Sequence, residues 1–191
     1  ITLSKNLMDN NIIKTFFKFQ PKSDPNLKGL LMEYAENSSL AVLIHYIYKA
    51  NYHGSNYSQN TKNSLNFMGG CLIKFIAYQI LSGMQSMEIH SICHLDLKPS
   101  NILITSGLIM KLADFSLTQL YEKSSKKMIK ITSGTNVIMG PEYYENGVIE
   151  KDLHKIDIFA FGMCLIKMST GNYFFPNEYK EYIYIPLNLV K

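Results

Sequence analysis

Hydrophobic residues along this 191-residue chain follow two kinds of spacing, and the first kind is typical of strands. Residues 12–20 and 29–34 are short segments rich in Ile, Leu and Phe, separated by proline, serine and asparagine residues that favour a turn. Residues 101–105 and 109–112 form a second such pair around a Ser-Gly dipeptide. We therefore expect two short antiparallel hairpins, with residues 1–11 as the end of a preceding helix.

The second kind of spacing repeats hydrophobic residues every three or four positions, as a helix with one buried face does. Residues 40–50, 65–89 and 153–170 have this spacing, and Gly171 follows the last of them, as glycine often follows a helix. Residues 121–133 are polar and basic, and we expect a long surface loop there. The longest helical segment predicts a wide buried face that contains Phe67, Met68, Cys71, Leu72, Phe75, Ile76, Ile80, Leu81, Met84 and Met87.

Composition is typical of a globular, single-domain intracellular protein. Hydrophobic residues make up 47% of the chain and charged residues 18%, which argues against a disordered chain. Cys71, Cys93 and Cys164 are widely spaced in apolar surroundings, so we expect buried reduced thiols and a cytoplasmic location. No apolar run is long enough to cross a bilayer, and residues 1–10 lack a signal-peptide pattern, so we expect no membrane partner.

Charge adds one restriction on partners. The net charge is +4, and the densest basic stretch, residues 123–130, is interrupted by serine and methionine. A nucleic-acid interface needs a denser basic patch on a helix or sheet face, so we expect a solvated loop and no nucleic-acid partner. An acidic protein surface remains the alternative partner for this stretch.

Two short motifs contain residues suited to phosphoryl transfer. His-Leu-Asp-Leu-Lys-Pro-Ser-Asn, residues 94–101, follows the longest helix, and Asp114-Phe115-Ser116 follows the second hairpin. Phosphoryl transfer needs a carboxylate to orient the attacking hydroxyl and metal ions to neutralise the triphosphate. Magnesium prefers oxygen ligands such as Asp and Asn, and a lysine can hold a phosphate as a point charge. Each motif alone is a weak signal, but their order around a hairpin is specific.

With these motifs the chain resembles the eukaryotic-type protein kinase family. Residues 94–101 resemble its catalytic loop, 114–116 its metal-binding Asp-Phe-Gly, and 134–142 the end of its activation segment. Residues 157–162 resemble the start of the buried helix that follows. Residues 32–35 resemble the hinge beside adenine, and residues 11–14 the entry to the strand before it. The resemblance covers nearly the whole chain.

The resemblance implies an α+β fold of the protein kinase type. Residues 1–34 would be a partial N-terminal lobe with an antiparallel sheet, and residues 35–191 would be the helical C-terminal lobe with the catalytic loop and activation segment. It also implies ATP and Mg²⁺ as cofactors and a protein as the second substrate. The substrate's identity and the oligomeric state cannot be read from the sequence.

Catalytic and metal-binding roles follow from the resemblance residue by residue. Asp96 would orient the substrate hydroxyl and accept its proton, and Lys98 would contact the γ-phosphate. Asn101 and Asp114 would hold magnesium. His94 would brace the loop by hydrogen bonds, and so would Asp157 from the following helix.

The resemblance also implies an adenine site. The backbones of Glu33 and Ala35 would hydrogen-bond the base, Met32 would be the gatekeeper, and Leu103 would lie beneath the ring. Lys98 and Thr135 resemble the serine/threonine branch of the family rather than the tyrosine branch.

Two departures from the family pattern concern the ends of the chain. The chain begins with Ile1 and contains neither the glycine-rich loop nor the lysine-bearing strand that clamp the nucleotide in this family. It ends soon after the 153–170 helix, before the helices that supply an arginine partner for Glu142. We therefore expect an incomplete domain with part of its apolar surface uncovered.

Two further departures are substitutions. Ser116 stands where the family has glycine, and we expect this to be tolerated, although it could also bias the orientation of Asp114. Leu95 stands where the family has the arginine that pairs with an activation-loop phosphate, so a phosphate on Ser124, Ser125, Thr132 or Ser133 would not be read there.

Two functional hypotheses follow. The first is an ATP-dependent serine/threonine protein kinase, of which this chain is an incomplete piece. The second is a pseudokinase-like binding or scaffolding module with the same fold and little turnover. The presence of Asp96, Lys98, Asn101 and Asp114 favours the first, and the absent front end favours the second for the chain as it stands.

Overall fold

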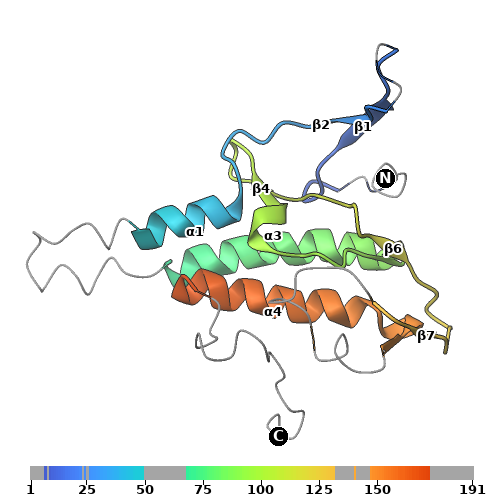
Figure 1. Ribbon diagram of the computed structural model, residues 1–191. Coiled ribbons are helices and arrows are strands. Elements are labelled where there is room, and N and C mark those ends of the chain that lie inside the picture. Colours follow the sequence, from blue (N-terminus) through green and yellow to red (C-terminus); the bar gives the residue numbers. More distant parts are fainter. Residues whose placement is uncertain are drawn as a thin grey trace, which may run out of the picture.

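Two long helices form the body of the protein. The computed structural model describes residues 7, 9–22, 24, 26–49, 68–131, 140 and 147–172. Within this part, α3 (Gly70–Ile89) and α4 (His154–Thr170) lie side by side, and the shorter α1 (Leu40–Lys49) lies at one end of the pair (Figure 1). The helices expected from the sequence at 40–50, 65–89 and 153–170 are thus confirmed, although α3 begins at Gly70.

Short strands connect these helices, and in the described residues they form four antiparallel pairs. Two of these pairs are the expected hairpins. The other two bring distant segments together. The pairs are β1 (Thr15–Phe19) with β2 (Gly29–Met32), β4 (Ile102–Ile104) with β5 (Met110–Leu112), β3 (Ile92–Cys93) with β6 (Gln119–Leu120), and β7 (Met128–Ile129) with β8 (Val148–Ile149).

The strand expected at residues 12–20 divides into two parts. Ile12 forms a parallel bridge with Leu112 of β5, and the Ile13 N–H donates to the Leu112 carbonyl at 2.8 Å. Only Thr15–Phe19 pairs with β2, and Figure 1 shows this hairpin standing away from the helices. The chain before the hairpin is therefore fixed to the body, while the hairpin itself projects from it.

One main core joins all three helices to the β4–β5 hairpin. It contains the α3 residues Ile76, Ile80 and Met87, together with Leu112 of β5 and Met168 of α4. Burying an isoleucine or leucine side chain contributes roughly 1.5–3 kcal/mol, so this cluster dominates the stability of the fold. The resulting arrangement of helices and small antiparallel sheets is the α+β class expected from the sequence.

The buried face of α3 is narrower than expected. Ile76, Ile80, Gly83 and Met87 are buried, and they recur at steps of four, three and four residues along one stripe. Gly83 lets Asn11 and Leu112 of β5 approach closely, because an added Cβ would lie 2.9 Å from the Asn11 carbonyl oxygen and 3.0 Å from Leu112 Cδ1. The prediction was wrong for Cys71, Leu72, Phe75 and Leu81, which are exposed. Cys71, Phe75 and Leu81 lie outside that stripe, whereas Leu72 continues it near the start of the helix.

A second cluster lies at the start of α4. Leu95, Tyr121, Ile131 and Val148 pack there with Leu153, so the segment that follows the β4–β5 hairpin is tied to α4 by apolar contacts. The loop expected at residues 121–133 is therefore not structureless, since Met128–Ile129 forms β7.

The cysteines only partly match expectation. Cys93 and Cys164 are buried, but Cys71 is exposed in the first turn of α3, and none of the three is in a disulfide. In the described part of the chain, no helix is both long and apolar enough to span a membrane.

Candidate active site

The motif loop lies between β3 and β4, and its position follows from local sequence. Pro99 opens the 3-10 turn Pro99–Asn101, where a missing N–H costs nothing. Leu97 is fully buried in the main core, so it anchors the backbone between Asp96 and Lys98. The loop is thus fixed to the body by an apolar residue between two polar ones.

Three of the predicted site residues meet in this loop. The Lys98 Nζ lies 2.7 Å from Asp96 Oδ2, and the Asn101 Nδ2 donates to the same oxygen at 3.0 Å. Asn101 Nδ2 also donates to the Asp96 backbone carbonyl at 2.9 Å. Asp96 is only 6% exposed, so these contacts offset much of the cost of burying its charge.

Asp157 holds the loop from α4. Its Oδ2 accepts from the His94 N–H at 2.6 Å and from the Cys93 thiol at 3.2 Å, and its Oδ1 accepts from the Leu95 N–H at 2.9 Å. Leu95 has a φ of 65°, a left-handed conformation that costs a non-glycine residue roughly 1–2 kcal/mol. The paired N–H bonds and the burial of the Leu95 side chain hold this conformation.

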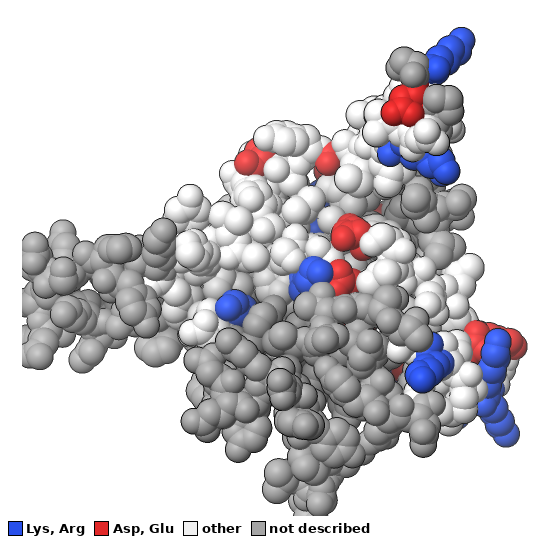
Figure 2. Space-filling view, in the orientation of Figure 1, with Lys and Arg blue, Asp and Glu red and all other residues white. Residues whose placement is uncertain are grey.

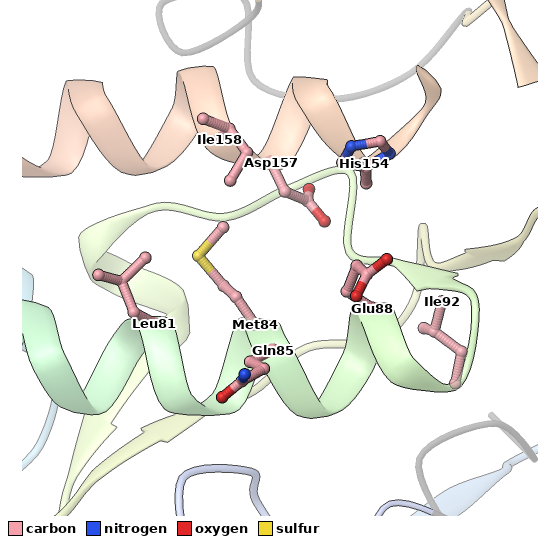
Figure 3. Close-up of a pocket in the computed structure, with 8 residues that line it drawn as sticks. All are labelled: Leu81, Met84, Gln85, Glu88, Ile92, His154, Asp157 and Ile158. Carbon is pink, nitrogen blue, oxygen red and sulfur yellow. The ribbon is translucent and has the colours of Figure 1, made fainter. Parts of the chain in front are cut away.

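Figure 3 shows the hollow beside this brace. Asp157 enters from α4 and Glu88 from α3, on either side of a space of about 240 Å³. Leu81 and Met84 of α3 and Ile158 of α4 supply apolar walls (Figure 3). The Asp157 hydrogen bonds therefore lie where α3 and α4 meet, and they attach the loop to these two helices.

His94 connects the two motifs. Its Nδ1 accepts from the Asp96 N–H at 3.3 Å, and its Nε2 lies 3.0 Å from the Ala113 carbonyl, which assigns the proton to Nε2. The ring also lies 5.2 Å from the Phe115 ring. The bracing hydrogen bonds expected of His94 and Asp157 are thus confirmed.

A backbone hydrogen bond from Ala113, the residue just before Asp114, is the second contact between the two motifs. The Ala113 N–H donates to the Asn101 carbonyl at 2.9 Å, which fixes Asn101 next to the start of the Asp-Phe-Ser motif. Asp114 is exposed and has a φ of 64°. Ser116 is not among the described residues with positive φ, and its N–H donates to Asp114 Oδ1 at 3.4 Å. The conformation that favours glycine is therefore found at Asp114 and not at Ser116.

The predicted hinge, residues 32–35, leads to the end of the β4–β5 hairpin that is farther from the catalytic loop. Asn37 and Ser38 exchange backbone hydrogen bonds of 2.9 Å with Ile104, and Leu103 stands opposite Lys111 in the hairpin. Glu33, Ala35 and Leu103 are half-buried, whereas Met32 is 43% exposed. The hairpin thus separates the catalytic loop from the hinge and fixes the position of both.

Lys111 contacts the predicted hinge, which the sequence analysis did not expect. Its side chain is 8% exposed, and its Nζ lies 2.8 Å from Glu33 Oε1, whose side chain is 26% exposed, so a partly buried ion pair joins the predicted hinge to β5. A lysine between Met110 and Leu112 in a short apolar strand was the available signal, because such a lysine needs a partner when buried.

Burial also changes the chemistry of two neighbours of the loop. Desolvation, and then the negative charge of Asp157, raise the pKa of Cys93 far above its ordinary value, so the thiol stays protonated and acts as a donor. Burial raises the pKa of Tyr121 to about 12, with smaller contributions from Glu88, Cys93 and Asp157.

The end of the predicted activation segment lies outside the described residues. This applies to Thr132, Ser133, Thr135 and Glu142, and to most of residues 134–142. Leu95, in contrast, is described, and it is 5% exposed in the second cluster. Leu95, which stands where the family has the arginine that pairs with an activation-loop phosphate, therefore packs against apolar neighbours.

Comparisons with known proteins agree with this geometry. Residues 1–187 match the sequence family described as protein kinase domain. A lectin-domain containing receptor kinase VI.3 of Arabidopsis thaliana is 30% identical over 173 residues, which are 83% of this chain and 22% of that protein. The serine/threonine-protein kinase mos of Atheris nitschei is 33% identical over 124 residues, 64% of each chain.

A probable serine/threonine-protein kinase of Dictyostelium discoideum is 26% identical over 151 residues, which are 77% of this chain and 15% of that protein. The chain thus spans about a fifth of the Arabidopsis receptor kinase and less of the Dictyostelium protein. A match to the kinase family over nearly the whole chain, together with the two motifs joined through His94, shows that the chain belongs to the eukaryotic-type protein kinase family.

Proposed function

We propose that this chain is the catalytic part of a serine/threonine protein kinase that transfers a phosphoryl group from Mg-ATP to a protein hydroxyl in the cytoplasm. The observation that carries the proposal is the convergence of Lys98 and Asn101 on Asp96 Oδ2, within 3.0 Å. In the proposed domain division, residues 1–34 belong to the N-terminal lobe and residues 35–191 to the C-terminal lobe.

Asp96 and Lys98 have the acceptor-side roles in this proposal. Asp96 orients the hydroxyl of a serine or threonine and accepts its proton as the new phosphorus–oxygen bond forms. Lys98 holds the transferring phosphate by charge, and its contact with Asp96 keeps both groups in one place. The hydrogen bonds from the His94 and Leu95 N–H groups to Asp157 support this role, because they fix the backbone just before Asp96. A catalytic base that is already held in position reacts more efficiently.

Asn101 and Asp114 fit a magnesium ion by the chemistry of their donors. The Nδ2 of Asn101 takes both bonds to Asp96, so its Oδ1 is the atom proposed as a ligand, and Asp114 offers a carboxylate at the surface. Magnesium takes one or two protein oxygens and completes its shell with phosphate oxygens and water. When bound, the ion neutralises charge on the phosphates.

The hinge supplies the nucleotide side. The Glu33 N–H donates to the Lys14 carbonyl at 2.8 Å, so Glu33 offers its carbonyl and Ala35 its backbone groups to the adenine. Met32 is the gatekeeper and Leu103 lies beneath the ring. The Glu33–Lys111 ion pair supports this role, because it fixes the hinge relative to β4–β5.

Thermal unfolding with and without Mg-ATP tests the proposal. Saturating Mg-ATP is expected to raise the melting temperature by about 5 °C, and Asp114→Asn is expected to lose the rise. Asp152→Asn is the matched control, since Asp152 pairs with Lys155 outside the proposed site. No rise in the unmodified chain would contradict the nucleotide site.

Transfer of radiolabelled phosphate to a mixture of proteins separates the enzyme from the alternative function. The kinase hypothesis predicts transfer that Asp96→Asn abolishes while the Mg-ATP shift remains. A pseudokinase-like binding module predicts the shift without any transfer.

A further inference from the structure

The chain that enters the catalytic loop donates three hydrogen bonds to Asp157 from three consecutive residues. Two of the donors are the backbone N–H groups of His94 and Leu95, at 2.6 and 2.9 Å from the carboxylate oxygens. The third donor is the side chain of Cys93, whose Sγ lies 3.2 Å from Oδ2. The thiol is thus the donor that depends on which side chain stands at its position.

Asp157 is a carboxylate for which every donor counts. It is only 6% exposed, and none of the ion pairs among the described residues includes it. A buried carboxylate without a paired cation is stabilised by the hydrogen bonds that it accepts, and bonds to a charged acceptor are stronger than those between neutral groups. A third donor therefore helps to keep the carboxylate charged and in place.

The thiol is fixed where it can donate. Cys93 is fully buried, and its backbone is held by pairing with Gln119 of β6. Sγ also lies 3.2 Å from the Leu153 carbonyl, so two acceptors compete for its one proton, and the charged Asp157 is the stronger of them. Burial, and then the charge of Asp157, raise the pKa of the thiol far above its ordinary value, so the proton stays on sulfur.

The position of this carboxylate reaches the proposed catalytic base in two steps. Asp157 fixes the His94 backbone through Oδ2, the same oxygen to which the thiol donates. The His94 ring in turn accepts from the Asp96 N–H at 3.3 Å through Nδ1. A shift of Oδ2 would therefore move the backbone that carries the Asp96 side chain, and small displacements of a catalytic group lower the rate of a reaction strongly.

We propose that the Cys93 thiol is a positioning residue of the catalytic loop, which orients the Asp157 carboxylate and through it places Asp96 for phosphoryl transfer. The effect on transfer rests on the proposed function, whereas the effect on the loop does not. A role in packing alone is the alternative, because Cys93 also belongs to the second core cluster with Leu95 and Leu153. The two roles differ in which replacement preserves the loop.

Two substitutions of Cys93 separate the donor from the packing volume. Cys93→Ser keeps a donor on the same Cβ but loses apolar volume, and Cys93→Val keeps apolar volume without any donor. Cys164 is the matched control, because it is also fully buried, lies on α4, and forms no hydrogen bond through its thiol within the described residues. The same two substitutions are made there.

Raman spectroscopy of the S–H stretching band reads the hydrogen bond directly. The band that is lost in Cys93→Ser is expected at a lower frequency than the band that is lost in Cys164→Ser, because donation to a charged acceptor weakens the S–H bond. Equal frequencies for the two thiols would overturn the inference.

Hydrogen exchange tests whether the loop depends on this bond. Cys93→Val is expected to accelerate exchange of the His94 and Leu95 amides on the order of tenfold beyond that of the Ile80 amide in α3, and Cys93→Ser is expected to preserve most of the protection. Both Cys164 variants should change the His94 and Ile80 amides alike. If Cys93→Val protects the loop as well as Cys93→Ser does, the thiol acts by packing and the inference fails.

Phosphoryl transfer is read separately on the same variants. Cys93→Val should lower kcat on the order of tenfold with little change in the KM for ATP, and Cys93→Ser should retain most of the activity. If the unmodified chain transfers no phosphate while the Raman and exchange results hold, the proposed activity fails and the dependence of the loop on the thiol stands. If transfer occurs and Cys93→Val leaves kcat unchanged, the thiol does not act on Asp96 and the inference fails.

Discussion

The catalytic loop is held by buried contacts with the rest of the protein, whereas the side chains of the β1–β2 hairpin are largely exposed. In the loop, Asp96 is 6% exposed, and its neighbours are fixed by Asp157 from a helix far along the chain. In the hairpin, Phe16, Phe17 and Phe19 are 44–51% exposed, and Figure 1 shows the two strands standing clear of the helices. The catalytic loop is thus anchored in the core, while the hairpin that leads to the proposed adenine site lies largely in solvent.

The difference shows what each half of the proposed site depends on. The loop is preorganised by buried polar contacts, so its geometry should survive changes at the surface and fail when one buried partner is lost. The hinge is attached at a few points, chiefly the Glu33–Lys111 ion pair and the hydrogen bonds to Ile104. Figure 2 shows the acidic and basic side chains of one face in small groups separated by uncharged ones.

Loss of Asp157 should have the largest effect. Asp157→Ala leaves the buried N–H groups of His94 and Leu95 without their acceptor, at a cost of about 3 kcal/mol in the free energy of unfolding. For a chain of this length, that corresponds to a fall in melting temperature of roughly 10 °C, measurable by calorimetry. It also releases the left-handed Leu95, so the loop should lose its order before the helices do.

Asp152→Ala is the control for this change, because Asp152 lies just before α4 and pairs with exposed Lys155. Its melting temperature should stay near that of the unmodified chain. If both variants melt alike, the brace is not what holds the loop.

The hinge attachment should contribute less. Lys111→Met keeps the buried stem but leaves Glu33 without its ion-pair partner, and because Glu33 still reaches solvent the cost should be about 1–2 kcal/mol. Hydrogen exchange of the Glu33 amide, which donates to Lys14, should accelerate more than that of the Ile80 amide in α3.

Lys123→Met provides the comparison for Lys111→Met. Lys123 also pairs with a glutamate, Glu88, at 2.8 Å, but about half of each side chain is exposed, so the change should cost less than about 1 kcal/mol. Equal costs for the two lysines would mean that burial does not strengthen the hinge attachment.

Spacing alone predicted the helices α1, α3 and α4 and the two hairpins β1–β2 and β4–β5, but not which side of an element is buried. The steps from Ile76 to Ile80, Gly83 and Met87 are visible in the sequence, yet Leu72, Phe75 and Leu81 continue a plausible apolar face. Choosing between them requires knowing that β5 packs at Gly83. The β7–β8 pair was missed for a similar reason, since each strand has two residues and its partner is distant in sequence.

The proposed site was more predictable because its residue types are tied to chemistry. The loop residues were named from their motif, and the resemblance supplied the brace from Asp157, which lies 63 residues beyond His94. What the motif could not give is that Leu95 would be buried with Tyr121 and Ile131. That contact ties down the following segment by packing, so a phosphate is not needed for this part of its order.

The smallest effect is expected in the hairpin. Phe17 is 51% exposed and pairs with Leu31 across the strands, so Phe17→Thr should change the free energy of unfolding by less than about 0.5 kcal/mol. Ile80→Val, a smaller change at a fully buried site, should cost about 1 kcal/mol and is the reference. Urea denaturation measures both. If Phe17→Thr costs as much as Ile80→Val, the hairpin is packed in solution against something, and a dependence of that cost on protein concentration would identify a second copy of the chain. In that case the contrast between a buried loop and an exposed hairpin would apply only to the isolated chain.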